Sequence, residues 1–483
     1  MTPGARLQAA VDLLAGIEAG PQPADIVSDA FFRARRYAGA KDRRAIAAQV
    51  FAVLRHRARL DWWLARAGGG EPSPRRRLLA ALVLVDGMTT AAVASLAGGR
   101  GHDLTPLSPE EERLLDALAG PRHRPGSRHV LRQAQDEGVE ARQSPHPELV
   151  EGCEGPPQVH AETLSGHGID HPDMPATVRL ECPDWLQPSL ERAWGAAWID
   201  ELTALNAPAP VDLRVNTLKT DRARAITALA RDGIDARPTP LSPIGLRLPG
   251  RTGLGATRAW RDGLVEVQDE GSQLAALLVD ARPGMAVADL CAGGGGKTLA
   301  LAAAMAWDKR PGGRLVAGDV SAGRLEGLRK RLRRLGLKGI EVHPTALADD
   351  AWIAANRQAF DRVLIDVPCS GSGTWRRNPD ARWRLSPADI ARYRALQRSI
   401  LATSAALVKP GGRSVYVTCS VLREENEDRV AAFLADASDF APVAIDALWR
   451  RFSDAPIPGP FLRLSPATTG TDGFFVAVLQ RHG

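Results

Sequence analysis

The spacing of apolar residues divides the chain into a helical first part and a last part in which strands alternate with helices. Between residues 1 and 118, apolar residues recur every three or four positions, as in Leu7, Val11, Leu14 and Ile17. This period is typical of amphipathic helices. Beyond residue 259 the expected order is a strand at 285–290, a helix at 298–305, a strand at 315–319, a helix at 322–335, strands ending at Asp366 and Thr418, and a strand at 474–479. That alternation predicts a doubly wound α/β sheet.

Two segments separate these parts. Residues 119–172 are rich in Pro, Gly, His, Gln and Glu and lack apolar periodicity, so they cannot bury enough apolar surface to offset the entropy of ordering. We expect a disordered linker or insertion there, which removes Cys153 and His146 as site candidates. Residues 173–258 alternate like strands at 211–216 and 244–248 and are helical at 223–230. They predict a small α+β subdomain.

Composition favours a globular protein with a mild preference for nucleic acid. The 483 residues exceed the about 250–300 that a single core supports, and 44% of them are hydrophobic. Only seven of the 62 basic residues are lysine, so arginine, which grips phosphate and stacks on bases, supplies the rest. Codon bias in a GC-rich genome explains this arginine content equally well. Basic runs such as 33–36, 41–44, 55–59 and 75–77 indicate RNA binding by the helical part, although such runs are usually solvated helix faces.

The five cysteines are far apart and include no CxxC pair, so we expect no zinc site and no other metal. Their odd number and the lack of a signal peptide favour reduced thiols in the cytoplasm. No apolar run approaches the roughly 20 residues that a bilayer-spanning helix needs, so no membrane partner is expected.

A glycine-rich turn, D-L-C-A-G-G-G-G-K-T from Asp289 to Thr298, follows the strand at 285–290. A P-loop would need glycine at Cys291, and a dinucleotide fingerprint starting at Gly293 would need glycine at Thr298. A strand, a turn without side chains and a helix start still let a ligand approach the backbone closely. The next strand ends at Asp319, an acid suited to ribose hydroxyls. A ligand with a ribose and no pyrophosphate is S-adenosylmethionine, and Asp289 is near enough to serve its amino-acid end.

Two cysteines follow neighbouring predicted strands, in the motifs Asp366-Val-Pro-Cys369-Ser-Gly and Thr-Cys419-Ser. Ligands in open α/β sheets bind beyond the carboxyl ends of the strands, so Asp366, Cys369 and Cys419 should share one crevice. Two thiols and a carboxylate suggest covalent chemistry on an electrophile. A single cysteine would be interpreted as a buried structural thiol, whereas two at strand ends favour function. Cys291 is expected to be a small buried hydrophobic residue rather than a participant.

These motifs resemble the RsmB/Sun-type (NOL/NOP/Sun) RNA cytosine-C5 methyltransferases. The resemblance covers roughly residues 175–483, and its further motifs are Arg214-Val-Asn216, Val267–Gln273, Thr374–Asp380 and Thr471–Phe475. The helical part resembles, more loosely, a NusB-like RNA-binding domain, through Lys41–Arg44 leading into Val50–Arg55. A NusB-like domain ahead of this core points to the bacterial ribosomal-RNA members of the family.

The resemblance implies a class I S-adenosylmethionine-dependent methyltransferase domain at 259–483, with a Rossmann-like doubly wound sheet. A small α+β subdomain at 173–258, a linker at 119–172 and an all-helical NusB-like RNA-binding domain at 1–118 would precede it. The implied cofactor is S-adenosyl-L-methionine, and the implied partner is RNA, above all 16S ribosomal RNA of the small subunit. The expected cofactor-binding residues are Cys291, Ala292, Gly293, Gly294, Gly295, Gly296, Lys297, Asp319 and Asp366.

The resemblance also assigns catalytic roles. It makes Cys419 the nucleophile that adds to cytosine C6 and Cys369 the residue that aids release, a distinction that spacing alone does not supply. Asp366, if it is protonated or shares a proton, is placed to act as an acid near N3. Lys297 either orients the base or Asp366, or is a surface cation at a helix start. Residues 376 and 377, both arginine, are expected to contact RNA phosphate.

The chain departs from the family pattern in two places. The usual Ala-Pro-Gly-Gly of the cofactor turn is Gly293–Gly296 here, so we expect a more flexible turn. The acid that usually binds the adenine amine after the third strand is missing from Val342–Ala346, with Asp349 and Asp350 slightly late, which leaves the adenine contact open. Three alternatives remain: a transfer-RNA cytosine-C5 methyltransferase, a DNA cytosine methyltransferase, which would not need Cys419, and a non-catalytic RNA-binding assembly factor.

Overall fold

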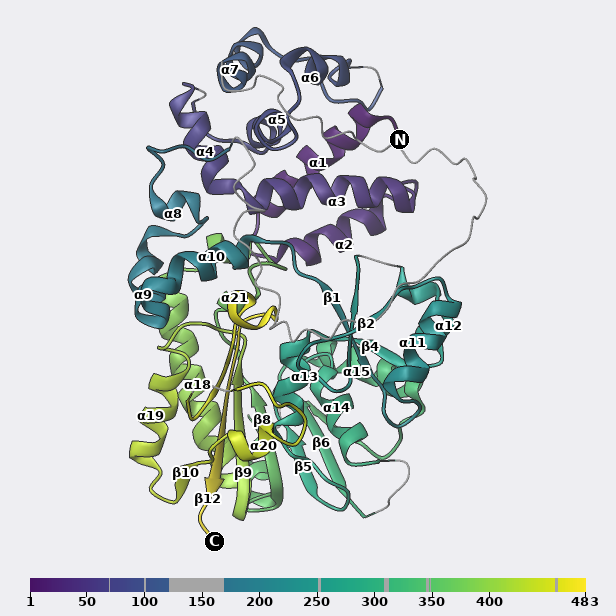
Figure 1. Cartoon of the computed structure of the whole chain (residues 1–483), viewed down its shortest axis with the longest axis vertical. Helices are drawn as coiled ribbons and strands as arrows, with labels where there is room; N and C mark the ends of the chain where they lie inside the picture. The colour runs from purple at the N-terminus through teal and green to yellow at the C-terminus, as the bar shows by residue number, and fades with distance from the viewer. Residues whose placement is uncertain are drawn as a thin grey trace, which may run out of the picture. The chain divides into compact units, whose positions relative to one another are not determined.

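The computed structural model describes residues 1–68, 70–99, 101–120, 169–250, 253–307, 312–344, 347, 349–456 and 459–483. Packing divides the chain into two compact units, Met1–Gln22 with Ile26–Arg179, and Pro23–Asp25 with Leu180–Gly483 (Figure 1). Most of the expected linker, including Cys153 and His146, lies outside the described residues. Among the helices of the described ranges, none has both the length and the apolar character needed to cross a bilayer.

The first unit is entirely helical where it is described. Its helices are α1 (Pro3–Glu18), α2 (Ala24–Ala34), α3 (Ala40–Arg55), α4 (Arg57–Arg66), α5 (Pro74–Leu84), α6 (Thr90–Leu96), α7 (Pro109–Ala119) and α8 (Ala176–Arg179). The most buried is α5, which contacts α1, α3, α4 and α7. Ser108 and Glu111 form a capping box that starts α7. Ile169 and His171, which follow the undescribed segment, are buried in this unit.

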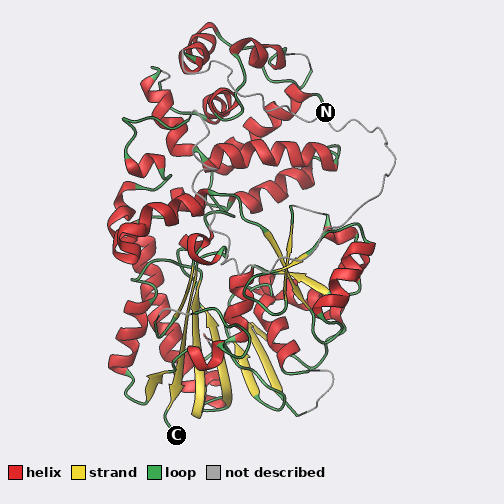
Figure 2. Cartoon of the chain, viewed as in Figure 1, coloured by secondary structure: helices red, strands yellow, loops and turns green. Residues whose placement is uncertain are grey.

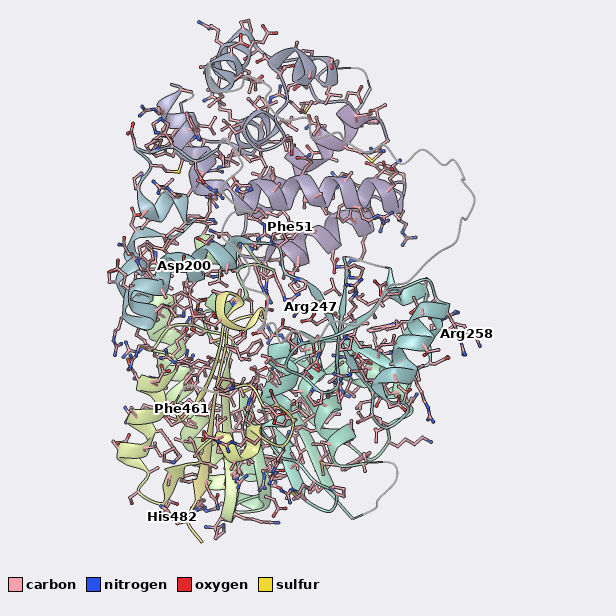
Figure 3. All side chains as sticks on the ribbon, in the orientation of Figure 1. Phe51, Asp200, Arg247, Arg258, Phe461 and His482 are labelled. Carbon is pink, nitrogen blue, oxygen red and sulfur yellow. The ribbon has the colours of Figure 1, made fainter. Side chains whose placement is uncertain are left out.

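The second unit begins with two helices, α9 (Gln187–Trp194) and α10 (Trp198–Asn206), and a small antiparallel sheet in the order β2-β3-β1-β4. The elements of this subdomain are β1 (Val211–Val215), α11 (Arg222–Arg231), β2 (Arg237–Pro238), β3 (Gly245–Leu248), α12 (Arg258–Arg261) and β4 (Val265–Val267). Arg247 on β3, labelled in Figure 3, donates to the buried Asp212 of β1 at 2.8 Å. Arg214 and Asn216, at the end of β1, are buried. Burial lowers the pKa of Arg214 to about 10.

The large sheet has the order β10-β12-β9-β8-β5-β6-β7, with β11 paired to β12. Its strands are β5 (Ala286–Asp289), β6 (Arg314–Asp319), β7 (Glu341–Pro344), β8 (Phe360–Asp366), β9 (Val408–Thr418), β10 (Phe440–Pro442), β11 (Leu462–Leu464) and β12 (Phe474–Arg481). The five strands from β7 to β9 are parallel, and β12 runs antiparallel to β9. From β5 the chain adds β6 and β7 on one side of β5, and it then crosses over to add β8 and β9 on the other side. This switch point is where open α/β sheets bind ligands.

Helices cover both faces of the large sheet, which gives three layers (Figure 2). One face packs against α13 (Glu270–Leu277), α14 (Gly296–Ala304), α15 (Ala322–Leu335) and α20 (Asp446–Trp449). The other packs against α16 (Asp350–Ala355), α18 (Pro387–Leu407) and α19 (Glu427–Asp436). Two short helices, α17 (Ala381–Arg384) and α21 (Pro466–Thr469), complete the unit. The doubly wound α/β fold expected from the sequence is confirmed. Its central strands β5, β6 and β8 are buried on both faces, which explains why they appear as apolar runs.

Candidate active site

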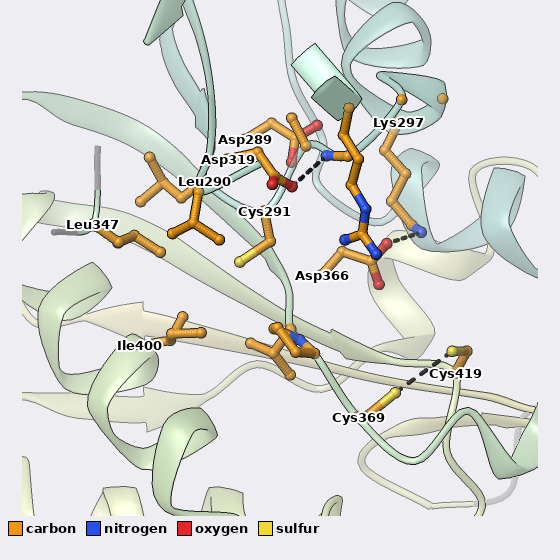
Figure 4. Close-up of a pocket in the computed structure, with 18 of the residues that line it drawn as sticks. Asp289, Leu290, Cys291, Lys297, Asp319, Leu347, Asp366, Cys369, Ile400 and Cys419 are labelled. Atoms are coloured by element: carbon orange, nitrogen blue, oxygen red, sulfur yellow. Dashed lines mark hydrogen bonds and ion pairs between the residues drawn. The ribbon is translucent and has the colours of Figure 1, made fainter. Parts of the chain in front are cut away.

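A cavity of about 570 Å³ opens at the carboxyl ends of β5, β6, β8 and β9. This volume is within the range of ordinary small-ligand sites. The structure brings together every expected site residue except Gly295, which does not line the cavity; those that do are Cys291, Ala292, Gly293, Gly294, Gly296, Lys297, Asp319, Asp366, Cys369 and Cys419. Figure 4 shows the two thiols, Lys297 and the three aspartates around this space.

The glycine-rich turn is held by backbone conformation and by two side chains. Gly293 and Gly295 have φ values of 54° and 81°, the left-handed region that favours glycine. The backbone N–H of Gly293 donates to Asp319 Oδ2 at 2.9 Å, and Arg331 donates to the Gly294 carbonyl at 2.8 Å. A Cβ at Gly295 would collide with Leu328 of α15, whose Cβ and Cγ lie at 3.2 and 3.1 Å. The turn therefore packs directly on the helix behind it.

Asp289 is the most perturbed carboxyl group of the cavity. It is buried, its Oδ2 accepts a hydrogen bond from Thr298 Oγ1 at 2.7 Å, and burial raises its pKa to about 7. Its Oδ1 is buried without a hydrogen-bond partner among the described residues. An orphaned carboxylate oxygen beside a turn that lacks side chains fits a ligand with a cationic amine, as expected for the amino-acid end of S-adenosylmethionine.

Lys297 and Asp366 form an ion pair in the cavity wall, with Nζ 2.6 Å from Oδ2. Lys297 is 7% exposed, which eliminates the surface-cation interpretation. Burial lowers the pKa of Lys297, but attraction to Asp366, the hydrogen bond to the same carboxylate and attraction to Asp289 together outweigh burial and raise the pKa above the ordinary value. The ammonium group also lies 5.3 Å from the centre of the Phe474 ring. The carboxylate of Asp366 is therefore held in one orientation by a permanent cation.

The thiols of Cys369 and Cys419 lie 3.5 Å apart, between Sγ atoms. β8 and β9 are adjacent parallel strands, so the loops that follow them bring the two half-buried cysteines together. The hydrogen bond with Cys419 and burial raise the pKa of Cys369 well above its ordinary value. Burial likewise raises the pKa of Cys291, which stands in the glycine-rich turn. Both groups are therefore thiols rather than thiolates near neutral pH.

The expected phosphate contacts of Arg376 and Arg377 are corrected by the structure. Arg376 is 5% exposed and pairs with Asp472, and Arg377 pairs with the same carboxylate and with Asp269 at 2.8 Å. These acids lie about 100 residues away on either side, so the motif alone did not reveal the pairing. The two arginines tie the loop after β8 to the residues before β12 and α13.

Two further expectations concern the adenine contact and a metal site. Asp349, considered for the adenine contact, accepts from the Trp352 backbone N–H at 2.9 Å and caps α16. The described residue that lines the cavity after β7 is Leu347. No group of three His, Cys, Asp or Glu side chains suited to a metal was found among the described residues.

Sequence reasoning missed Glu425, which is buried and joins the two cysteine loops. Each cysteine is followed by a serine, Ser370 or Ser420, and this shared pattern was the available signal.

A doubly wound sheet with a glycine-rich turn after its first strand and an acid at the end of the second is a fold that binds a ribose-containing ligand at the switch point. Residues 276–480 match the family model for the 16S rRNA methyltransferase RsmB/F, and residues 182–254 match the ferredoxin-like domain of RsmF/B-like methyltransferases. The family match makes this chain an S-adenosylmethionine-dependent methyltransferase. The "Probable ribosomal RNA small subunit methyltransferase B" of Synechocystis is 36% identical over 323 residues, which cover 66% of this chain and 71% of that protein. The chain therefore belongs to the RsmB/F family of 16S rRNA methyltransferases, as its motifs suggested.

Solved structures agree with this fold. A methyltransferase homologue from Pyrococcus horikoshii is similar with a TM-score of 0.54 and 29% identity, over 63% of this chain and 97% of that one. The protein PH0851 is similar with a TM-score of 0.72 over 100% of this chain and 99% of that one, at 24% identity.

Proposed function

We propose that the protein methylates C5 of a cytosine in 16S ribosomal RNA, with Cys419 as the nucleophile and Cys369 as the residue that assists release. The observation that carries this proposal is the pair of thiols, 3.5 Å apart, in a cavity that also contains the Lys297–Asp366 pair. One thiol is enough for a nucleophile. A second at this distance gives the site a separate proton-holding group.

Cytosine C5 is a poor nucleophile towards a methyl group, and covalent addition of a thiolate to C6 makes C5 more nucleophilic. The Cys419 thiolate forms a bond to C6, and the electron pair of the C5–C6 double bond moves into the ring. Asp366, which shares a proton with Lys297 through their hydrogen bond, acts as the acid near N3 and stabilises the charge that develops there. Bound S-adenosylmethionine supplies the electrophilic methyl group that C5 attacks. A base then removes the C5 proton, the C5–C6 double bond re-forms and the Cys419–C6 bond breaks.

The local charges support these roles. Attraction between Lys297 and its acidic neighbours, Asp366 first among them, raises the lysine pKa, so Lys297 stays a cation in the wall of the cavity. Cys369 has its pKa raised well above the ordinary value, so it is a thiol that can hold a proton during release. The cavity therefore supplies a cation beside Asp366 and a thiol that holds its proton.

The test is a trapping experiment with 16S rRNA and S-adenosylmethionine, read as a protein–RNA species on a denaturing gel. We expect Cys369→Ala to accumulate the covalent species and Cys419→Ala to form none and to lose methyl transfer. Cys182→Ala, which removes a buried thiol outside the cavity, is the control and should behave as wild type. Methyl transfer that survives Cys419→Ala would refute the proposal.

The modified nucleotide is found by bisulfite sequencing of ribosomal and transfer RNA from a deletion strain. Protection of a 16S rRNA cytosine that disappears in the deletion supports the proposal, whereas loss confined to transfer RNA supports the alternative substrate. Titration with S-adenosylmethionine addresses the non-catalytic alternative, since an assembly factor without cofactor binding would give no signal.

A further inference from the structure

Glu425 is a buried acid that the proposed chemistry does not use. It lies in the loop after β9, five residues beyond Ser420, and its exposed fraction is 0%. No Lys, Arg or His side chain of the described residues forms an ion pair with it. A buried carboxylate without a cation is costly unless hydrogen bonds satisfy its oxygens, so its position calls for an explanation.

Both oxygens of Glu425 are satisfied by donors from the cysteine loops and from α18. Oε1 accepts from the backbone N–H of Ser370 at 2.9 Å and from Gln397 Nε2 at 3.0 Å. Oε2 accepts from the hydroxyls of Ser370 at 2.5 Å and Ser420 at 2.6 Å. Ser370 directly follows Cys369, and Ser420 directly follows Cys419. One side chain therefore binds the neighbours of both thiols, which are 50 residues apart in the chain.

These hydrogen bonds of Glu425 to Ser370, Ser420 and Gln397, called the clamp below, are themselves held in place. Gln397 also donates to the Pro368 carbonyl at 3.0 Å, so the groups on both sides of Cys369 are fixed. Tyr416 of β9 donates its hydroxyl proton to the Glu425 carbonyl at 2.6 Å, which anchors the backbone that carries the acid. Ser370 Oγ and Ser420 Oγ also lie 3.1 Å apart. Few rotamers are left open to any member of this network.

We propose that Glu425 is a positioning residue for both cysteines: its carboxylate joins the two loops and so fixes the distance and direction between the Cys369 and Cys419 thiols. The inference rests on the proposed function for its catalytic meaning, although the clamp can be tested without it. Glu425 touches neither the thiols nor the cavity, so it acts through the serines that follow the cysteines.

The negative charge of Glu425 also acts on the thiol of Cys369. After the hydrogen bond with Cys419 and burial, nearby negative groups, among them Glu425, raise the pKa of Cys369 further. The carboxylate of Glu425 thus helps to keep the proton on Cys369.

The first test measures methyl transfer to 16S rRNA by Glu425→Gln as a function of pH. The amide keeps the shape, and serine hydroxyls can rotate to accept from it, but the charge is lost. We expect kcat to fall about tenfold or more, with KM for both substrates within about threefold of wild type. The alkaline limb of the pH profile of kcat should move to lower pH, because the pKa of Cys369 falls when a neighbouring negative charge is removed.

The matched control is Glu201→Gln. Glu201 is also a buried carboxylate, 3% exposed, and accepts from the Ser465 hydroxyl at 2.7 Å, outside the thiol cluster. We expect its kcat and alkaline limb to match wild type. Equal losses in both variants, or a Glu425→Gln profile identical to wild type, overturn the inference.

The second test needs no RNA and no methyl donor. Diamide oxidises two adjacent thiols to a disulfide, and peptide mapping identifies the Cys369–Cys419 bond in the full chain. We expect Glu425→Ala to slow this closure by about tenfold relative to wild type and to Glu201→Ala, because the loops lose their shared anchor. An unchanged rate overturns the inference. If the Cys419→Ala variant still methylates RNA, the proposed function fails, but the rate of disulfide closure in the chain with both cysteines still decides whether the clamp exists.

Discussion

The glycine-rich turn yields the most quantitative prediction, Gly295→Ala. The residue has φ = 81°, and an alanine in the left-handed region costs about 1–2 kcal/mol. The added methyl group collides first with the Cδ1 methyl of Leu328, and the Cβ and Cγ of the same side chain lie at 3.2 and 3.1 Å, so the whole leucine side chain must shift. Leu328 is fully buried in the core of the sheet, and overpacking of a filled core costs about 1–3 kcal/mol.

The two effects together destabilise the unit by about 2–5 kcal/mol, which corresponds to a fall of about 3–8 °C in Tm for a unit of about 300 residues. Differential scanning calorimetry of the free protein measures this loss. Titration calorimetry with S-adenosylmethionine should show weaker binding as well, because the turn can relieve the collision only by moving the backbone that lines the cavity.

Two matched variants separate the causes. Gly293 has φ = 54° with no atom within 4 Å of the added Cβ, so Gly293→Ala should show the backbone cost alone, about 1–2 kcal/mol. Gly296 has no positive φ and meets Gln268 only at 3.7 Å, so Gly296→Ala should be neutral or stabilising by about 0.4–1 kcal/mol. Equal Tm values for the Gly295 and Gly296 variants would refute the reasoning.

Three further substitutions test the charges. The folded state raises the pKa of Asp289 from 3.8 to about 7, so the free energy of unfolding falls as pH rises between these values. At pH 8 the Asp289→Asn variant should therefore be more stable than wild type, by up to about 4 kcal/mol, and should melt at a higher temperature in thermal scans. Near pH 4 the two proteins should melt at the same temperature. Lys297→Met leaves Asp366 without its cation and should lower single-turnover methyl transfer about 100-fold with the fold intact by circular dichroism. Asp472→Asn leaves Arg376 and Arg377 with the carboxylate of Asp269 alone, so the free energy of unfolding in urea should fall by about 3–5 kcal/mol. The salt dependence of RNA binding should stay unchanged, because in the fold neither arginine is expected to contact phosphate.

Local patterns were sufficient to predict five strands of the large sheet, β5, β6, β8, β9 and β12, and two of the helices that pack on it, α14 and α15. The helix expected at 322–335 is α15 (Ala322–Leu335), since Ser321 caps it and Gly336 ends it in a left-handed conformation. The apolar run at 362–365 is the buried part of β8, and the turn residues stand where strand β5 ends. These features depend on neighbours in the chain, which a single sequence contains.

What the sequence did not supply depends on partners far away in the chain. The basic pair at 376–377 looked like a phosphate contact because Asp269 and Asp472, about 100 residues away, neutralise it only in the fold. Glu425 was missed for the same reason, as its donors come from two other segments. Lys297 was left between two interpretations, and only the burial of its side chain decided between them. Pairings between distant charges have no local signature.

The adjacency of β8 and β9 has a consequence for protein engineering. Neighbouring parallel strands lie about 4.8 Å apart, so short loops leaving their ends start almost within reach of each other. A pair of reactive side chains at these two positions needs only short loops and a buried group, such as Glu425, that joins the two loops by hydrogen bonds. Other sheets with the same winding should accept a transplanted dithiol at the equivalent strand ends, provided that the acid and the two hydroxyl residues are transferred along with the sulfurs.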